Sequence, residues 1–297
     1  MKNKICIVTG ANSGIGKETA RALAQRQAEV VMVCRNPQKG EAALTDIQQS
    51  SGNKNVHLFI ADLSSQASIT GFAEAFKQQF EKLDVLVNNA GVFLPRREVT
   101  ADGTEATFAI NHLAYFQLTH LLLDLLIQTP ASRIVNVSSN AHKGGGALDF
   151  DDLELEKGYG GYKAYARSKL ANILFTTELD RRLDALDLET RPTVNCLHPG
   201  VVATSLTAGT RSFFGFIFNL FSPFYLRPSK GAETSIYLAS APEVAAVSGQ
   251  YFDERKAVEP RESAKDASAA QRLWEVSAAM TGLEELPPAI RKDSRRD

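Results

Sequence analysis

The chain has 297 residues and nearly balanced charge, with 33 lysines and arginines against 34 aspartates and glutamates. A chain of this length can bury a large core without a metal or a disulfide, and it lacks the basic excess of nucleic-acid-binding proteins. Its three cysteines stand in apolar, strand-like runs without metal-binding spacing, which predicts reduced thiols and no metal site. The first residues enter an apolar run at once and leave no room for a signal peptide. We therefore expect a cytoplasmic protein that binds no nucleic acid.

Short apolar runs alternate with helical patterns along the chain. Because the runs are apolar without interruption, they predict strands buried on both faces, as in a parallel sheet covered by helices. The alternation predicts one doubly wound α/β domain over residues 1–283, followed by a polar tail at 284–297. A long pattern at 104–128 is apolar nearly all round, which predicts a buried or partner-covered helix. The expected strands are 4–9, 29–34, 55–62, 84–89, 133–139, 193–199 and 248–253.

The first expected strand runs into TGANSGIG at residues 9–16, and a helical pattern follows directly. The three glycines permit a tight turn, a close approach of the backbone to a pyrophosphate, and close helix–strand packing. The helix N-terminus behind them offers unpaired N–H groups to an anion. At the first strand of such a series we favour a dinucleotide cradle over a plain strand–helix turn. The residues expected to contact the cofactor here are Gly10, Asn12, Ser13, Gly14, Ile15 and Gly16.

Arg35 stands at the end of the second expected strand, where an NAD site usually carries an acidic residue. An arginine there suits the 2′-phosphate of NADP(H), since a guanidinium pairs with phosphate through a rigid fork of charged hydrogen bonds. The alternative is an ordinary exposed arginine at a strand end. The missing acid and the arginine both favour NADP(H).

Tyr165 and Lys169 are four residues apart and so share one face of an expected helix. Hydride transfer to a carbonyl needs a proton donor, and a neighbouring cation should lower the tyrosine pKa toward the working pH. Tyr159 also precedes a lysine by four residues, but the two glycines that follow it disfavour a helix. We therefore predict Tyr165 as the proton donor and place Tyr159 and Tyr162 on the substrate-side loop or the surface.

A pair of serines, Ser138 and Ser139, ends the fifth expected strand. A hydroxyl at this edge of the sheet could hydrogen-bond a substrate oxygen as charge develops on it. The histidines at 57, 112, 120, 142 and 198 share no metal-binding or catalytic spacing, so we expect them to be structural.

These motifs together resemble the short-chain dehydrogenase/reductase superfamily over residues 4 to about 255. Within it the chain looks most like the retinol dehydrogenase branch. The resemblance rests on TGANSGIGKETA, VCRNPQKGEAA, INHL, RIVNVSSNAH, YARSKLANILFTTEL and LHPGVV. It implies a Rossmann-type sheet of about seven strands in the order 3-2-1-4-5-6-7, with helices on both faces.

The resemblance also implies roles for single residues. Ser139 would be the catalytic serine and Lys169 would hold the cofactor ribose. Asn111 would hold a water of the proton relay, or else its amide caps a local kink. Asp62 would flank the adenine together with Leu63, and it could also be the N-cap of the following helix. The other cofactor contacts implied are Asn89, Ala90, Gly91, Tyr165, Pro199, Gly200, Val202 and Thr204.

The chain departs from the family pattern at Ala114-Tyr115, where relatives often have Gly-His, and in the glycine run at 144–146. The resemblance implies hydride transfer between NADPH and the carbonyl or alcohol of a lipophilic substrate, with retinal or retinol as the leading candidate. A steroid, a quinone or another apolar carbonyl is an alternative substrate, and a non-catalytic NADP(H) sensor is an alternative function. Pairing through the helices around 113–127 and Tyr165 would give a homodimer.

Six phenylalanines gather in FFGFIFNLFSPFY at 213–225. The run is shorter than the ~20 apolar residues of a membrane-spanning helix. It follows the turn expected at the nicotinamide, so we predict a substrate lid at about 203–228, with Phe214 and Phe218 against the substrate. Ordinary core is the alternative, and transient contact with a membrane surface is a lesser role.

Overall fold

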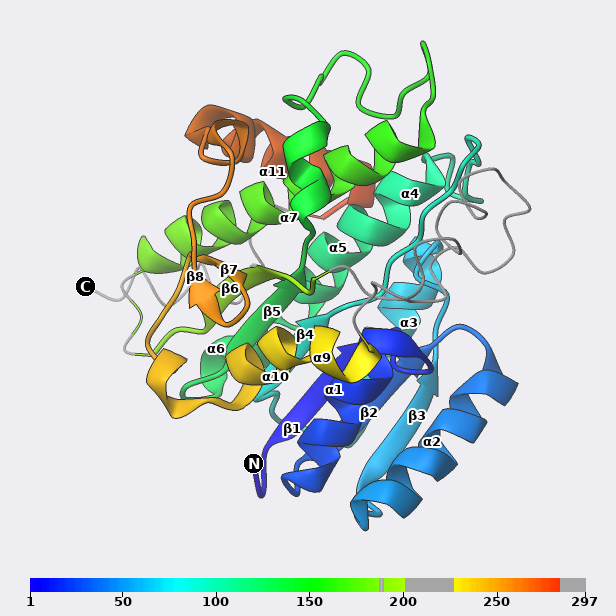
Figure 1. Cartoon of the computed structure of the whole chain (residues 1–297), viewed down its shortest axis with the longest axis vertical. Helices are drawn as coiled ribbons and strands as arrows, with labels where there is room; N and C mark the ends of the chain where they lie inside the picture. Colours follow the sequence, from blue (N-terminus) through cyan, green and yellow to red (C-terminus); the bar gives the residue numbers. More distant parts are fainter. Residues whose placement is uncertain (187, 189, 201–226, 284–297) are drawn as a thin grey trace.

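A computed structural model describes residues 1–186, 188, 190–200 and 227–283. An eight-stranded sheet in the order β3-β2-β1-β4-β5-β6-β7-β8 forms its centre (Figure 1). All neighbouring strands are parallel except β8, which pairs antiparallel with β7. The strands are β1 Ile5–Thr9, β2 Glu29–Cys34, β3 Val56–Ile60, β4 Val85–Asn88, β5 Arg133–Val137, β6 Thr193–His198, β7 Tyr251–Asp253 and β8 Lys256–Ala257.

This sheet confirms the predicted doubly wound α/β fold and the predicted order of the first seven strands. The eighth strand was not predicted. It has only two residues, both exposed, so it carries none of the apolar pattern that marks the buried strands.

Helices cover both faces of the sheet (Figure 1). Neighbouring residues of β1 show why its sequence is apolar throughout: Ile5 and Ile7 pack in one core layer, whereas Cys6 and Val8 pack in the other. One layer is covered by α1 Gly14–Gln25, α2 Pro37–Ser51, α9 Pro228–Gly231 and α10 Glu233–Ser240. The other is covered by α3 Gln66–Gln79, α5 Ala114–Leu121, α6 Leu123–Gln128, α7 Gly161–Asp184 and α11 Ala267–Thr281.

The long apolar segment between β4 and β5 is buried as predicted, but it is not one regular helix. A short α4, Ala106–Phe108, leads into a π-helical turn, η1, at Ala109–Leu113, and α5 and α6 follow. The carbonyl of Asn111 within η1 accepts a hydrogen bond of 2.9 Å from Nδ2 of Asn172 on α7. Such π turns are frequent at functional sites, and this one carries the predicted site residue Asn111.

The C-terminal helix α11 packs on α5 and α7. The Trp274 ring lies 5.0 Å from that of Phe116 and 6.0 Å from that of Phe175, measured between ring centroids. Nε2 of His112 lies 2.9 Å from the Ser277 hydroxyl, and burial lowers the His112 pKa to about 4, which fits a neutral structural histidine. The faces expected to pair with a second copy are therefore partly covered by the chain's own helix. The homodimer stays a prediction, and α11 argues against it.

The structure also bears on two further expectations, that the cysteines are reduced thiols and that the chain has no membrane-spanning helix. Cys6, Cys34 and Cys196 are buried and free. Within the described ranges, no helix combines the length and the apolar character that crossing a membrane requires. The expected tail at 284–297 lies outside these ranges, as does nearly all of the expected lid at 203–228.

Candidate active site

The predicted site residues that the structure describes lie mostly at one edge of the sheet, where the carboxyl ends of the parallel strands meet. The backbone of Gly10 directly after β1 has a positive φ of 67°, which favours glycine. A Cβ atom on Gly16 would lie 2.5 Å from the Gly10 carbonyl oxygen and would also collide with Nδ2 of Asn89. Glycine at position 16 therefore allows the start of α1 to pack closely on the turn after β1. The N-terminus of α1, where unpaired N–H groups favour an anion, lies directly after this turn.

Asn89 and Ala90, which follow β4, are hydrogen-bonded to the end of β1. Nδ2 of Asn89 donates to the Thr9 carbonyl at 2.8 Å. The backbone N–H groups of Asn89 and Ala90 both donate to the Thr9 hydroxyl, at 2.9 and 3.0 Å. The structure therefore joins two of the predicted cofactor segments into one surface beside the glycine turn.

Asp62 does not cap the helix that follows it, so the alternative role considered for it is wrong. The helix α3 begins at Gln66, and its N-cap is Ser65, whose hydroxyl accepts from the Ser68 N–H. The Asp62 carboxylate instead accepts from both the N–H and the hydroxyl of Ser64, at 2.9 and 2.7 Å. A short turn between β3 and α3 thus holds Asp62 and the half-buried Leu63 at the edge of the sheet.

Arg35 is exposed directly after β2. The next residue, Asn36, caps α2 by accepting a hydrogen bond of 2.8 Å from the Lys39 N–H. Among the described residues, no hydrogen bond or ion pair engages the Arg35 guanidinium. Its position fits a 2′-phosphate contact, and it fits an ordinary exposed arginine equally well.

Tyr165 and Lys169 lie one turn apart on α7, and β5 brings Ser139 to them. The Ser139 side chain lies beside the Tyr165 hydroxyl, and this contact acts to lower the Tyr165 pKa. The Ser139 oxygen also accepts from the Ala141 N–H at 3.1 Å, which holds the hydroxyl in place after β5. Ser138 is buried, and its hydroxyl donates to the Lys169 carbonyl at 2.7 Å. The structure therefore places Ser139, rather than Ser138, beside the tyrosine.

Tyr159 occupies a different place, before the first turn of α7. Its hydroxyl donates to the Leu94 carbonyl at 2.9 Å and lies 3.1 Å from the Thr107 hydroxyl. Gly160 is the N-cap of α7, so Tyr159 and Lys163 do not share a helical face. Tyr162 is 51% exposed.

The electrostatics of the Tyr165–Lys169 pair differ from the expectation. Burial lowers the pKa of Lys169 to about 7. Burial raises the pKa of Tyr165, and the hydrogen bond from Ser139 opposes this rise only in part. We expected Lys169 to lower the Tyr165 pKa, and this expectation is wrong for the chain without a cofactor. Desolvation of Tyr165 outweighs any attraction from Lys169, because Lys169 is itself only partly charged near pH 7.

Asn111 is held beside Lys169 but does not cap a kink. Its Oδ1 accepts from the Val92 N–H at 2.7 Å, and its Nδ2 donates to the Val92 carbonyl and the Ser168 hydroxyl, both at 3.0 Å. A Cβ atom on Gly91 would lie 3.2 Å from Oδ1 of Asn111 and 3.5 Å from Nζ of Lys169. Its role in a proton relay stays a prediction.

Two histidines that spacing did not connect support the turn that carries Ser139. Nδ1 of His142 donates to the Ser139 carbonyl at 2.7 Å, and Nδ1 of His198 accepts from the Asn140 N–H at 3.2 Å. Burial lowers the pKa of both histidines, which favours these neutral contacts. The order of the strands could have suggested them, since His198 ends β6, the direct neighbour of β5.

Phe93 is a further residue that the sequence analysis did not single out. Its half-buried ring meets the Tyr165 ring edge-on, with 5.9 Å between centroids. Phe93 stands two positions after Gly91, the last residue of the predicted cofactor segment. An aromatic residue two positions beyond that segment was the available signal.

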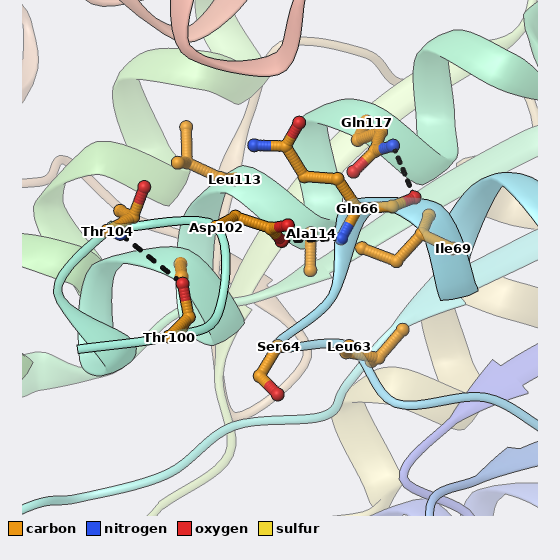
Figure 2. Close-up of a pocket in the computed structure, with 11 residues that line it drawn as sticks. Leu63, Ser64, Gln66, Ile69, Thr100, Asp102, Thr104, Leu113, Ala114 and Gln117 are labelled. Atoms are coloured by element: carbon orange, nitrogen blue, oxygen red, sulfur yellow. Dashed lines mark hydrogen bonds between the residues drawn. The ribbon is translucent and has the colours of Figure 1, made fainter. Parts of the chain in front are cut away.

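A separate pocket lies beside Leu63 and does not include the Tyr165 cluster. It opens between the start of α3, the Thr100–Thr104 loop and η1, with about 230 Å³ of empty space that includes open solvent. Figure 2 shows the Gln117 amide at its wall, donating to the Gln66 carbonyl at 3.0 Å. Leu63 is the one predicted site residue among those lining it.

Two more predicted residues, Pro199 and Gly200, follow β6 at the same edge of the sheet. Gly200 has a positive φ of 80°. Val202, Thr204, Phe214 and Phe218 lie outside the described residues.

The sequence model of the short chain dehydrogenase family matches residues 4–213. The chain belongs to this family. It is therefore an oxidoreductase, and the predicted family is confirmed. It is 42% identical to retinol dehydrogenase 12 of Mus musculus over 95% of this chain and 87% of the relative. It is 44% identical to retinol dehydrogenase 11 of Homo sapiens over 95% and 87% of the two chains.

Two solved structures have a similar fold. An uncharacterised protein from Mycobacterium Paratuberculosis superposes with a TM-score of 0.78 at 34% identity, over 96% of each chain. A variant of the actinorhodin polyketide ketoreductase, whose structure contains NADPH, superposes with a TM-score of 0.67 at 27% identity. This second match covers 85% of this chain and 97% of the ketoreductase.

Proposed function

We propose that this short-chain dehydrogenase transfers a hydride between NADP(H) and the carbonyl or alcohol of a lipophilic substrate, with retinal or retinol as the leading candidate. The observation that carries the proposal is the contact of Ser139 with the Tyr165 hydroxyl, with Lys169 one turn away. The names of the relatives, retinol dehydrogenases 11 and 12, support the substrate class. The NADPH-containing ketoreductase supports the cofactor.

The residues present fit the cofactor. The turn at Gly10–Gly16 would hold the pyrophosphate, Arg35 the 2′-phosphate, and Lys169 the ribose next to the reacting centre. Bound NADPH supplies the hydride for reduction of the carbonyl carbon. Tyr165 stays protonated at neutral pH because its pKa is raised, so it can donate a proton to the carbonyl oxygen. Ser139 hydrogen-bonds the same oxygen and stabilises the charge that develops on it.

A direct test measures turnover of the full chain with retinal, a steroid ketone, a quinone and a short aldehyde, each with NADPH and with NADH. We expect the highest kcat/KM for an extended apolar carbonyl with NADPH. Higher kcat/KM for the short aldehyde would contradict the substrate class. Failure to consume either cofactor across the panel would favour the non-catalytic sensor instead.

Arg35→Asp should reverse the cofactor preference. Loss of a charged pairing with the 2′-phosphate should lower kcat/KM for NADPH by about 10²-fold, while the new carboxylate can accept from a ribose 2′-OH and raise kcat/KM for NADH. Arg26→Asp is the matched control, since Arg26 is an exposed arginine at the C-terminal end of α1. Equal losses in both variants would show a general effect of charge and would remove Arg35 from the cofactor site.

Phe93→Ala should raise KM for a large apolar carbonyl by about 10-fold and change KM for a short aldehyde little, because an aromatic contact contributes on the order of 1 kcal/mol. Phe150→Ala is the matched control, since the Phe150 ring packs under the Arg272 guanidinium at 4.6 Å rather than on Tyr165. The same KM change for both substrates would show that Phe93 does not select among them. Contacts of Phe214 and Phe218 with the substrate stay part of the proposal.

A cytoplasmic location also belongs to the proposal. The three buried, free cysteines are in keeping with a reducing compartment. Transient contact of the phenylalanine-rich run with a membrane surface is a lesser part of it, and co-sedimentation with vesicles of zwitterionic and anionic lipid would test this contact.

A further inference from the structure

The buried ammonium group of Lys169 lies between two tyrosine rings. Its Nζ is 5.6 Å from the ring centroid of Tyr165 and 5.7 Å from that of Tyr115 on α5. Both distances fall within the ~6 Å range over which an aromatic ring attracts a cation. Tyr115 is 1% exposed, so this contact is shielded from water.

The Tyr115 ring is held at both ends. Its backbone belongs to α5, and its hydroxyl donates to the Ala90 carbonyl at 2.8 Å. Ala90 is itself bonded to the Thr9 hydroxyl at the end of β1. The ring that faces Lys169 is thus anchored to the strand segment predicted to support the cofactor.

The surroundings of Lys169 offer little else to stabilise a positive charge. The Val137 carbonyl on β5 accepts from Nζ at 2.9 Å. Gly91 and the Asn111 amide lie close by, and the titratable groups that face Nζ are Tyr165 on its own helix and Tyr115 on α5. Across the described ranges no carboxylate forms an ion pair with Lys169, and burial is what lowers its pKa to about 7. The two ring faces and one carbonyl are therefore the groups that oppose the desolvation of the ammonium group, and they do so only in part.

We propose that Tyr115 is a positioning residue, whose anchored ring favours the protonated form of Lys169 and holds it in place beside Tyr165. The contact between ring and ammonium group is a property of the chain itself. Its effect on turnover rests on the proposed function.

The direct test measures the Lys169 pKa by NMR in the cofactor-free chain labelled with ¹³Cε-lysine, with Lys169→Met to assign the signal. Replacement of Tyr115 by phenylalanine, and then by phenylalanines of increasing ring fluorination, keeps the shape of the ring while its attraction for a cation falls. We expect Tyr115→Phe to keep the Lys169 pKa nearly unchanged and full fluorination to lower it by about one pH unit. A Lys169 pKa that does not respond to fluorination would overturn the proposal.

Phe116→Leu serves as the matched control. Phe116 is equally buried on α5, but its ring packs on Trp274 at 5.0 Å. We expect it to lower the unfolding temperature without moving the Lys169 pKa. An equal pKa change in this variant would assign the effect to general loosening of α5 and would also overturn the proposal.

A second test of the proposal measures how kcat with NADPH depends on pH, using whichever substrate the enzyme converts. In the fluorinated Tyr115 variants, kcat at pH 8 should fall by about 10-fold, with the profile displaced to lower pH and KM nearly unchanged. An unchanged profile together with a lowered Lys169 pKa would overturn the link to catalysis. If no substrate is found, the NMR titration still decides whether the ring holds the ammonium group, so failure of the proposed function stays separate.

Discussion

Tyr165→Phe should lower kcat by about 10²- to 10⁴-fold while NADPH binding stays close to that of the unchanged chain. The substitution removes the hydroxyl that contacts Ser139 but keeps the ring that packs against Phe93 and Lys169. Lys169 and the glycine turn, which would hold the cofactor, are untouched. Steady-state kinetics gives kcat, and the change in NADPH fluorescence on binding gives the dissociation constant.

Tyr159→Phe is the control for this prediction. It removes the hydroxyl of the other tyrosine with the same spacing, which bonds the Leu94 carbonyl at 2.9 Å, away from Ser139. We expect turnover to persist, with a loss of about 1 kcal/mol in the free energy of unfolding. Near-normal turnover in Tyr165→Phe, or a collapse of turnover in Tyr159→Phe alone, would refute the assignment.

Lys169→Met should abolish turnover and also stabilise the cofactor-free chain by about 1–3 kcal/mol at pH 7. Lys169 is 3% exposed, and burial lowers its pKa to about 7 from an ordinary value of 10.5. Folding therefore buries a charge at acidic and neutral pH, and this cost disappears when methionine replaces lysine. Urea unfolding of both chains measures the difference.

The stability advantage of Lys169→Met should depend on pH, because the folded and unfolded chains release the lysine proton at different pH values. Between pH 7 and about 10.5 the unfolded chain keeps the lysine proton and the folded chain releases it. The unfolded state then binds more protons, so the stability of the unchanged chain rises with pH across this window. The advantage of Lys169→Met should thus be largest at pH 7 and below and should shrink by pH 9.5. Lys163→Met, at an exposed lysine in the first turn of α7, should show no such trend. A pH-independent advantage in Lys169→Met would show that the ammonium group carries no desolvation cost.

Sequence patterns were sufficient to predict a structural feature wherever the physical cause of that feature is local. The inner parallel strands β1, β2, β4, β5 and β6 were predictable because they are buried on both faces and are therefore mostly apolar. The edge strand β3 is only partly buried. Gly10 and Gly16 indicated the predicted dinucleotide cradle. Gly10 has a positive φ that favours glycine, and Gly16 packs too close to the Gly10 carbonyl for a side chain to fit. Tyr165 could be separated from Tyr159 because two glycines start the helix after Tyr159.

Other features depend on which distant segments share a face, and no local pattern encodes this. The π turn at Asn111 is bonded by Asn172, 61 residues along the chain. Burial decides the direction of the Tyr165 pKa shift, and burial depends on how other segments pack around the tyrosine. Phe93 meets Tyr165 only because the segment after β4 ends beside α7.

By itself the sequence determined the fold class, which follows from the alternation of apolar runs and helical patterns, and the family, which follows from its motifs. The order of the first seven strands was implied by the resemblance to that family. Only the tertiary structure decided that α11 covers the helices expected to pair, that His142 and His198 support Ser139, and that Tyr115 faces Lys169. Apart from the contact of His142 with the Ser139 carbonyl, which lies within one turn, these contacts join elements far apart in the chain. Such contacts form because packing buries those surfaces together, and burial also sets the charge state of the groups at the site.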